Sequence, residues 1–206
     1  MLSTLNCLKK LGLIVNLKSK YCEIYGEGLN SYNYKKNLTL NAGNSGTLGR
    51  LLLGLLVHSK KKITLIGDKS LSKRDFSRVT KPLKKFGANF YSNQKNKLPL
   101  SIMGTEYAKP IKYIENKGSA QCKSSVMLAA LNTKGITSIK AKKSRNHTEL
   151  LFKYLKIPIS IKKTKKYDFI KIKGKKKIQP FNYTIPADIS SSAFFIVLTA
   201  LSENSK

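Results

Sequence analysis

The sequence repeats one pattern roughly every 70 to 75 residues, and this period restricts the chain to a fold built from similar units. Residues 8–12, 83–87 and 152–156 resemble one another. Each segment closes a stretch whose apolar residues recur at helical spacing. Gly12 and Gly87 stand where a helix commonly ends on a residue in the left-handed conformation. The sequence therefore predicts three equivalent helices.

A strand hairpin is expected after each of these helices. The predicted strands alternate in the manner of strands, and each hairpin ends at a glycine. The hairpins pair residues 14–17 with 22–25, 88–91 with 98–102, and 157–161 with 169–172, and the glycines are Gly26, Gly104 and Gly174.

A third strand and a second helix complete each unit, and the second helix starts from small polar residues. A further strand, at 63–66 or 137–140, then leads to the next copy. The helix starts are 43–47, 118–121 and 188–192, and the apolar runs behind them are 51–57, 126–131 and 193–201.

Helices that are apolar on nearly all sides are buried on most sides. We therefore expect a compact α/β fold with the second helices bundled inside sheets. Residue 1 opens in the middle of a repeat, and residue 206 follows the third apolar helix directly. On this pattern the chain is expected to be truncated, which would leave apolar faces of helices 2–11 and 194–201 exposed.

The chain carries a formal net charge of +30, from 40 lysine and arginine residues against 10 aspartate and glutamate residues. Such a charge is typical of proteins that bind nucleic acid or anionic membranes. However, only four of the basic residues are arginine, the residue that binds phosphate oxygens two at a time. We therefore interpret the charge as lysine spread over solvated surfaces, and we expect neither a specific nucleic acid nor a membrane as a partner.

The apolar runs and the cysteines indicate the compartment. The longest runs, 51–57 and 193–201, are far shorter than the ~20 residues that a membrane-spanning helix needs. Cys7, Cys22 and Cys122 are too scattered for a disulfide framework or a zinc site. We expect a cytoplasmic protein without a metal.

The three small-residue helix starts are the strongest functional signal. A helix N-terminus presents free N–H groups to an anion, and glycine lets the ligand approach the backbone. Ordinary helix capping also explains such residues, and it suits Asp188 best, because a carboxylate would repel an anion.

Arginines near the first two starts favour anion binding there. Arg50 lies one turn into the first helix, Arg74 is expected to open the helix that follows, and Arg145 precedes another helix start. Each could hold a phosphate or carboxylate through charge-assisted hydrogen bonds. Arg78 is instead expected on a solvated helix face, and His147 is expected to have a structural role.

Five motifs occur in the same order as in one known family. They are Leu-Asn-Ala-Gly-Asn-Ser-Gly-Thr-Leu-Gly-Arg at 40–50, Gly-Asp-Lys-Ser-Leu-Ser-Lys-Arg at 67–74, Gly-Ser-Ala-Gln-Cys-Lys-Ser-Ser at 118–125, Ser-Arg-Asn-His-Thr-Glu at 144–149 and Pro-Ala-Asp-Ile-Ser-Ser-Ser-Ala-Phe-Phe at 186–195. Together these motifs closely resemble the signature of the 5-enolpyruvylshikimate-3-phosphate synthase family. The resemblance spans the chain and about half of the family's length.

The resemblance implies an activity and a fold. The family transfers the enolpyruvyl group of phosphoenolpyruvate to the 5-hydroxyl of shikimate 3-phosphate and releases phosphate, a step in the biosynthesis of aromatic amino acids, without a cofactor. Its fold has two domains, each made of three βαβαββ units, with the active site between them. Residues 1–186 would form most of one domain, and 187–206 would begin the other.

The resemblance also assigns binding residues. The positions that match phosphoenolpyruvate contacts, which the inhibitor glyphosate would share, are Gly46, Arg74, Gln121 and Asn44. The positions that match shikimate 3-phosphate contacts are Ser119, Ala120, Gln121 and Arg145. By the same resemblance Thr47 shapes the first loop and Arg50 supports it.

The chain also departs from the family pattern. The family's N-terminal Lys-Ser-x-x-x-Arg motif and the acidic proton-transfer residue of its second domain have no counterpart here. Asp75 replaces a usual proline, and Asn146 replaces a usual aspartate. The resemblance therefore places no catalytic residue in this chain, and we expect the chain to be inactive alone. The family is usually monomeric, but a chain with exposed apolar faces could self-associate.

Two alternatives stay open at this point. The related transferase that acts on UDP-N-acetylglucosamine uses a mobile-loop cysteine, and none of the three cysteines is placed by motif for that role. A basic nucleic-acid-binding module would gather arginine and aromatic residues on one face. Here the tyrosines and phenylalanines fall mostly at apolar strand and helix positions.

Overall fold

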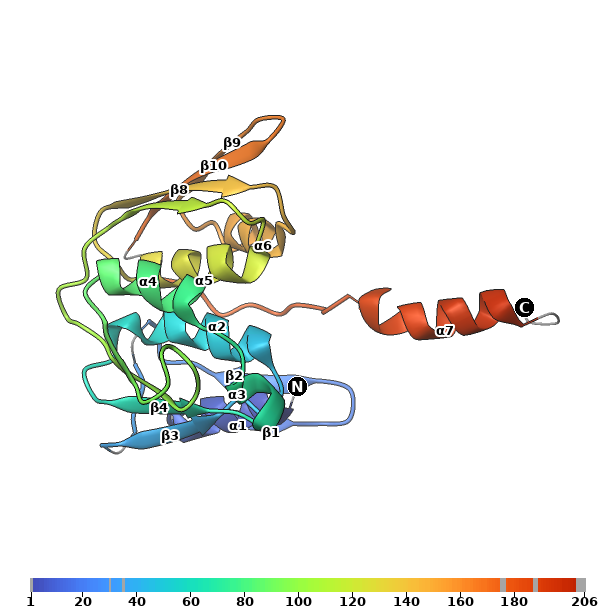
Figure 1. Ribbon diagram of the computed structural model, residues 1–206, viewed down its shortest axis with the longest axis horizontal. Helices are drawn as coiled ribbons and strands as arrows, with labels where there is room; N and C mark the ends of the chain where they lie inside the picture. Colours follow the sequence, from blue (N-terminus) through green and yellow to red (C-terminus); the bar gives the residue numbers. More distant parts are fainter. Residues whose placement is uncertain (1, 30, 35, 175–176, 187–188, 203–206) are drawn as a thin grey trace.

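The computed structural model describes residues 2–29, 31–34, 36–174, 177–186 and 189–202. Figure 1 shows two sheets with helices packed between them. The helices of this middle layer include α2 (Gly46–Leu55), α4 (Ser77–Lys85) and α5 (Ala120–Ala130). The predicted arrangement, with apolar helices inside and sheets outside, is therefore confirmed for the first two second helices.

The two sheets have the same topology, which confirms the repeat. One sheet has the order β3-β4-β6-β5, and the other has the order β7-β8-β10-β9. In each, the first two strands are parallel and the remaining pairs are antiparallel. The strands of the first sheet are β3 (Leu38–Asn41), β4 (Ile63–Ile66), β5 (Asn89–Ser92) and β6 (Leu100–Met103), and those of the second are β7 (Lys112–Glu115), β8 (Ile136–Lys142), β9 (Ile159–Lys163) and β10 (Tyr167–Lys173).

The first unit contributes α1 (Leu2–Lys10) and a separate hairpin of β1 (Ile14–Leu17) and β2 (Cys22–Tyr25). The two strands have the bounds that the alternation predicts. Gly12 and Gly87 have φ values of +93° and +111°, which confirms the predicted left-handed helix ends. On α1, Leu2 is exposed, as expected for this helix, but Leu5 is buried.

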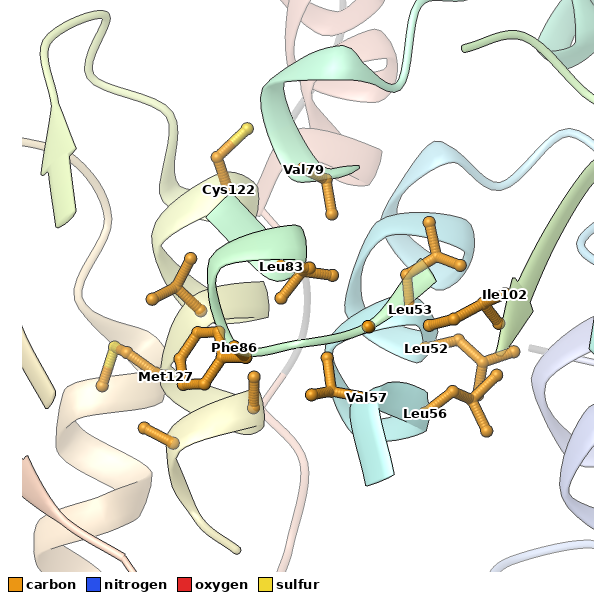
Figure 2. Close-up of a cluster of buried hydrophobic side chains, with 14 of the residues drawn as sticks. Leu52, Leu53, Leu56, Val57, Val79, Leu83, Phe86, Ile102, Cys122 and Met127 are labelled. Carbon is orange, nitrogen blue, oxygen red and sulfur yellow. The ribbon is translucent and has the colours of Figure 1, made fainter. Parts of the chain in front are cut away.

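The core joins side chains from all three helices of the middle layer. Leu53 from α2, Val79 and Leu83 from α4, and Cys122 and Met127 from α5 are all buried (Figure 2). A short 3-10 helix, η1 (Leu56–His58), extends α2 into the same cluster. Each large apolar side chain that is fully buried contributes roughly 1.5–3 kcal/mol, so this cluster fixes how the helix layer packs.

Two short helices replace the single helix start expected at Arg74. The chain forms α3 (Lys69–Ser72), capped by the Asp68 side chain, and α4 begins only at Ser77. Arg74 lies in the bend between them and is exposed. The reason is local: Asp68 accepts a hydrogen bond from the amide of Leu71, and Asp75 accepts one from the amide of Ser77, so each helix has its own start.

The third unit departs from the repeat. No strand occurs in 177–186, and α7 (Ile189–Leu201) projects away from the two sheets (Figure 1). Phe194 and Leu201 on this helix are 81% and 79% exposed, which confirms the exposure expected for 194–201. Unlike the first two second helices, α7 is not bundled between the sheets. The irregular segment before it leads the chain away from the sheets that would cover it. Asp188, expected to cap this helix, lies outside the described residues, and the assignment of 187–206 to a second domain stays a prediction.

None of the helices in the described part of the chain is long and apolar enough to cross a membrane.

Gly54 tests the close packing of α2 on α5. A Cβ added at this residue would lie 2.2 Å from the carbonyl oxygen of Ser125. Gly54→Ala should therefore force the helices apart and lower the free energy of unfolding by about 1–3 kcal/mol, the usual cost of overpacking. Urea titration followed by circular dichroism measures the change.

Gly26→Ala is the matched control, because a Cβ there meets no atom within 4 Å. Its free energy of unfolding should stay within about 0.5 kcal/mol of the parent chain. Equal effects of the two substitutions would show that the contact between α2 and α5 is not tight.

Candidate functional site

The start of α2 is held by local hydrogen bonds, and its first residue, Gly46, is buried. Ser45 caps the helix, and its Oγ accepts a hydrogen bond from the amide of Leu48 at 3.1 Å. Gly43 precedes it with φ +57°, and its amide donates to Asn41 Oδ1 at 2.8 Å. Because Ser45 takes the Leu48 amide, and the Gly49 amide bonds the Ser45 carbonyl, the amides of the first turn that an anion can bind are those of Gly46 and Thr47.

Two arginines converge on Gly46. A Cβ added there would lie 2.9 Å from Arg50 Nη1 and 3.2 Å from Arg74 Nη1. A side chain at this position would therefore displace the Arg50 guanidinium and crowd that of Arg74, so glycine allows both groups to lie against the backbone. The Arg50 guanidinium also lies 5.5 Å from the ring centroid of Phe76, which holds its plane. The result is a cluster of two cations at a helix N-terminus.

Gln121 connects this cluster to the second unit. Its Oε1 accepts a hydrogen bond from Arg50 Nη1 at 2.6 Å, and its Nε2 donates to Thr47 Oγ1 at 2.7 Å. Gln121 lies in the first turn of α5, whose start is capped by Ser119. The structure thus brings together residues of the first three motifs, at the starts of α2 and α5.

Glu115 on β7 fixes the start of α5 by hydrogen bonding. Its Oε2 accepts a hydrogen bond from the amide of Ser119 at 2.8 Å, and its Oε1 accepts one from Arg78 Nη2 at 2.8 Å. Glu115 is only 3% exposed. Arg78 lies exposed on α4, as expected, and its guanidinium also neutralises this buried carboxylate. Ala120 is the first residue of α5 and is half-buried.

The loop with Arg145 is fixed by a buried lysine. Lys123 Nζ donates to the carbonyl oxygen of Arg145 at 3.0 Å and pairs with Glu149 Oε1 at 2.5 Å. Ser124 Oγ also bonds Thr148 Oγ1 at 2.7 Å. These contacts hold the start of α6 (His147–Tyr154), confirmed where expected, against α5. The Arg145 side chain itself is exposed.

Asn44 and Asp68 fix the other side of the first loop. Asn44 Nδ2 donates to Asp68 Oδ2 at 2.5 Å, and the amide of Leu71 donates to Asp68 Oδ1 at 2.7 Å. These hydrogen bonds, with the nearby charge of Arg74, lower the pKa of Asp68 below its usual value. Asp68 is therefore ionised at neutral pH and acts as a structural acceptor rather than as a proton donor.

Sequence reasoning missed three structural partners of the site: Glu115, Lys123 and Glu149. One signal was available for Lys123, since a lysine within the buried face of a helix that continues into an apolar run needs a carboxylate partner. The partner could not be read from the sequence, because Glu149 lies on another helix.

The chemistry that this arrangement supports is anion binding. Arg50, Arg74 and two helix N-termini supply donors and positive charge, while nearby Asp68 and Glu115 already accept structural hydrogen bonds. In the part of the chain that the structure describes, no three His, Cys, Asp or Glu side chains gather in a way that could hold a metal.

The buried ion pair of Lys123 and Glu149 gives a direct test of how the start of α6 is held against α5. Lys123→Met should leave the Glu149 carboxylate buried without its cation, at a cost of about 3–5 kcal/mol in the free energy of unfolding. The double variant Lys123→Met/Glu149→Leu removes both charges and should recover most of that loss. Chemical denaturation of the three proteins checks this. If the double variant is as unstable as Lys123→Met, the loss of stability does not come from the unpaired Glu149 carboxylate.

Comparisons with known proteins agree with this geometry. The family model for EPSP synthase (3-phosphoshikimate 1-carboxyvinyltransferase) matches residues 1–206. Curated relatives named 3-phosphoshikimate 1-carboxyvinyltransferase include that of Thermoanaerobacter sp. (strain X514), 40% identical over 208 residues, and that of Bacillus subtilis (strain 168), 37% identical over 207. Both alignments cover 100% of this chain and 47% of the relative.

A solved structure of EPSP synthase from Acinetobacter baumannii is similar with a TM-score of 0.84 and 35% sequence identity. The similarity covers 99% of this chain and 45% of that chain. The chain thus spans about half the length of the relatives it matches. With a family model matched along its whole length and a fold shared at this level, the chain belongs to the EPSP synthase family.

Proposed function

We propose that the protein transfers the enolpyruvyl group of phosphoenolpyruvate to the 5-hydroxyl of shikimate 3-phosphate, with release of phosphate. The observation that carries this proposal is the convergence of Arg50 and Arg74 on Gly46, joined to α5 through Gln121. Phosphoenolpyruvate carries a phosphate and a carboxylate, so a site for it needs several fixed donors. Helix N-termini and guanidinium groups are donors of this kind.

The two helix starts divide between the two substrates. Phosphoenolpyruvate is bound at Gly46 and Arg74, with Asn44 shaping the loop and Gln121 facing both ligands. Shikimate 3-phosphate is bound at Ser119, Ala120 and Gln121, with Arg145 near its phosphate. This assignment is supported by the motifs and by the hydrogen bonds that link the two starts.

The same donors suit the chemical step. Transfer of the enolpyruvyl group breaks the bond to phosphate, and negative charge gathers on the departing group. Donors that are already fixed in place stabilise such charge without reorganisation. The hydrogen bonds that hold Arg50 between Gly46 and Gln121 provide this preorganisation.

The related transferase that acts on UDP-N-acetylglucosamine is not favoured. The family model and the curated relatives carry the name of the shikimate enzyme. In addition, Cys122 is buried inside the α5 start, so it is not presented on a loop as an acid.

The described residues supply the anion-binding face without a free acid or base at its centre, because Asp68 and Glu115 hold helix starts in place. We infer that turnover requires the part of the enzyme that corresponds to the other half of the relatives.

A crossed substitution tests the division between substrates. Arg74→Lys loses the planar fork and should weaken phosphoenolpyruvate binding at least tenfold, about 1.4 kcal/mol. Arg145→Lys should weaken shikimate 3-phosphate binding and leave phosphoenolpyruvate binding nearly unchanged. Isothermal titration of the 206-residue chain with each ligand measures both constants, and each variant is the control for the other. Unchanged binding of phosphoenolpyruvate by Arg74→Lys would contradict the assignment.

A phosphate-release assay tests the activity. The 206-residue chain alone, given both substrates, should release no phosphate above background. A chimera that joins it to the unmatched part of the Bacillus subtilis relative should release phosphate, and Arg74→Ala should abolish that release. An inactive chimera that folds and binds both ligands would refute the proposed reaction, while turnover by the chain alone would refute the need for the second half.

A further inference from the structure

The two sheets differ sharply in charge. The four strands of the first sheet contain no charged residue, whereas every strand of the second sheet carries lysine. The exposed lysines that alternation places on the outer face of the second sheet are Lys112, Lys140, Lys142, Lys162, Lys171 and Lys173. At the first sheet, Lys62 Nζ lies 6.0 Å from the ring centroid of the exposed Tyr91, but none of the strand positions is a lysine, so lysine is denser on the second sheet.

Cross-strand register gathers these lysines into one patch, here termed the lysine face. Lys140 on β8 pairs with Phe169 on β10, and Phe169 pairs with Lys162 on β9. One step along, Lys171 on β10 pairs with Ser138 on β8. Residues directly opposite on neighbouring strands lie side by side on the same face. Positive charge therefore covers at least three adjacent strands.

No carboxylate offsets this charge on the outer side of the described strands. The only acidic residues in these four strands are Glu115 and Asp168. Both are buried, at 3% and 6% exposed, and alternation turns them toward the helices. Like charges this close repel one another, so a patch of this kind is stabilised by an anionic partner.

Aromatic rings lie among the lysines. Phe169 is 40% exposed, and Lys140 Nζ lies 4.7 Å from the Tyr167 ring centroid and 5.8 Å from that of Phe169. A hollow of about 470 Å³ opens beside the turn that joins β9 to β10. Its lining consists of Lys142, Lys143, Lys165, Lys166 and Tyr167. The lysine face thus combines positive charge with flat rings.

We propose that the lysine face binds single-stranded nucleic acid without sequence preference. Lysines track the phosphate backbone, and the rings of Phe169 and Tyr167 stack with bases, the combination that such binders use. The exposed ring of Phe169, beside the half-buried ring of Tyr167, favours this partner over an inorganic polyphosphate chain or an anionic membrane, because neither of those has bases to stack. Sequence specificity is not expected, since the face carries lysine rather than the bidentate arginine. The lysine face lies on the opposite side of its sheet from the substrate-binding helix starts.

Fluorescence anisotropy with a labelled 12-mer of oligouridylate tests the proposal on the 206-residue chain. The triple variant Lys140→Gln/Lys162→Gln/Lys171→Gln should lose at least tenfold in affinity at 100 mM salt. The slope of log K against log salt should become shallower by about 2, because each of the three lost phosphate contacts removes about 0.7 from it. Phe169→Leu should lose several-fold while its salt slope stays unchanged.

The matched control is Lys81→Gln/Lys84→Gln/Lys85→Gln, which removes the same charge from exposed positions on α4. It should change affinity less than twofold. Equal losses in the two triple variants would overturn the proposal and restore an even lysine bias.

A competition experiment distinguishes single-stranded nucleic acid from the two other polyanions, inorganic polyphosphate and anionic membranes, as the partner of the lysine face. Unlabelled oligouridylate should displace the label better than polyphosphate of equal charge or vesicles with 30% phosphatidylserine. Stronger displacement by either one, or unchanged binding by Phe169→Leu, would overturn the proposal. Since Phe169→Leu retains every charge, this arm stays informative if the triple variant fails to fold.

Discussion

The direct contact between α2 and α5 is the constraint on which the rest of the structure depends. Gly54 allows the backbones to approach until its Cα faces the Ser125 carbonyl, and Ser125 Oγ donates to the Arg50 carbonyl at 2.8 Å. This spacing places the two helix starts side by side, so that Gln121 reaches both Arg50 and Thr47. A site composed of two repeats therefore depends on a glycine two turns away from it.

The acidic residues around the site serve the structure. Glu115 holds the start of α5, Asp68 holds the start of α3, and Glu149 neutralises the buried Lys123. Glu149 offsets the burial of Lys123 and Glu115 pairs with Arg78, whereas Asp68 accepts hydrogen bonds from the Leu71 amide and the Asn44 side chain. Positive charge near Gly46 is left for a ligand. Because the carboxylates are bound to structural groups and the arginines near Gly46 are not paired with them, a strongly basic chain can fold around a cationic site.

Much of the fold could be predicted from the sequence, because local patterns determine it. Alternation gave the bounds of β1, β2 and β4, and Gly12 and Gly87 marked the helix ends. Motifs also indicated the residues at Gly46 and Gln121 that the structure brings together. The pairing of Arg78 with Glu115 could not be predicted, since the two residues lie on different elements 37 positions apart in the sequence. The exposure of residues 194–201 on α7 was expected from the sequence, because no segment of the repeat follows to cover this helix.

The most direct test of the account is an NMR titration. Proton–nitrogen correlation spectra of the 206-residue chain are recorded while phosphoenolpyruvate and shikimate 3-phosphate are added together. The account predicts that amides at both helix starts, including Gly46, Thr47, Ala120 and Gln121, shift with a single apparent affinity, while β10 amides stay unchanged. Shifts at only one helix start, or only at residues remote from both, would contradict a binding site shared by two repeats.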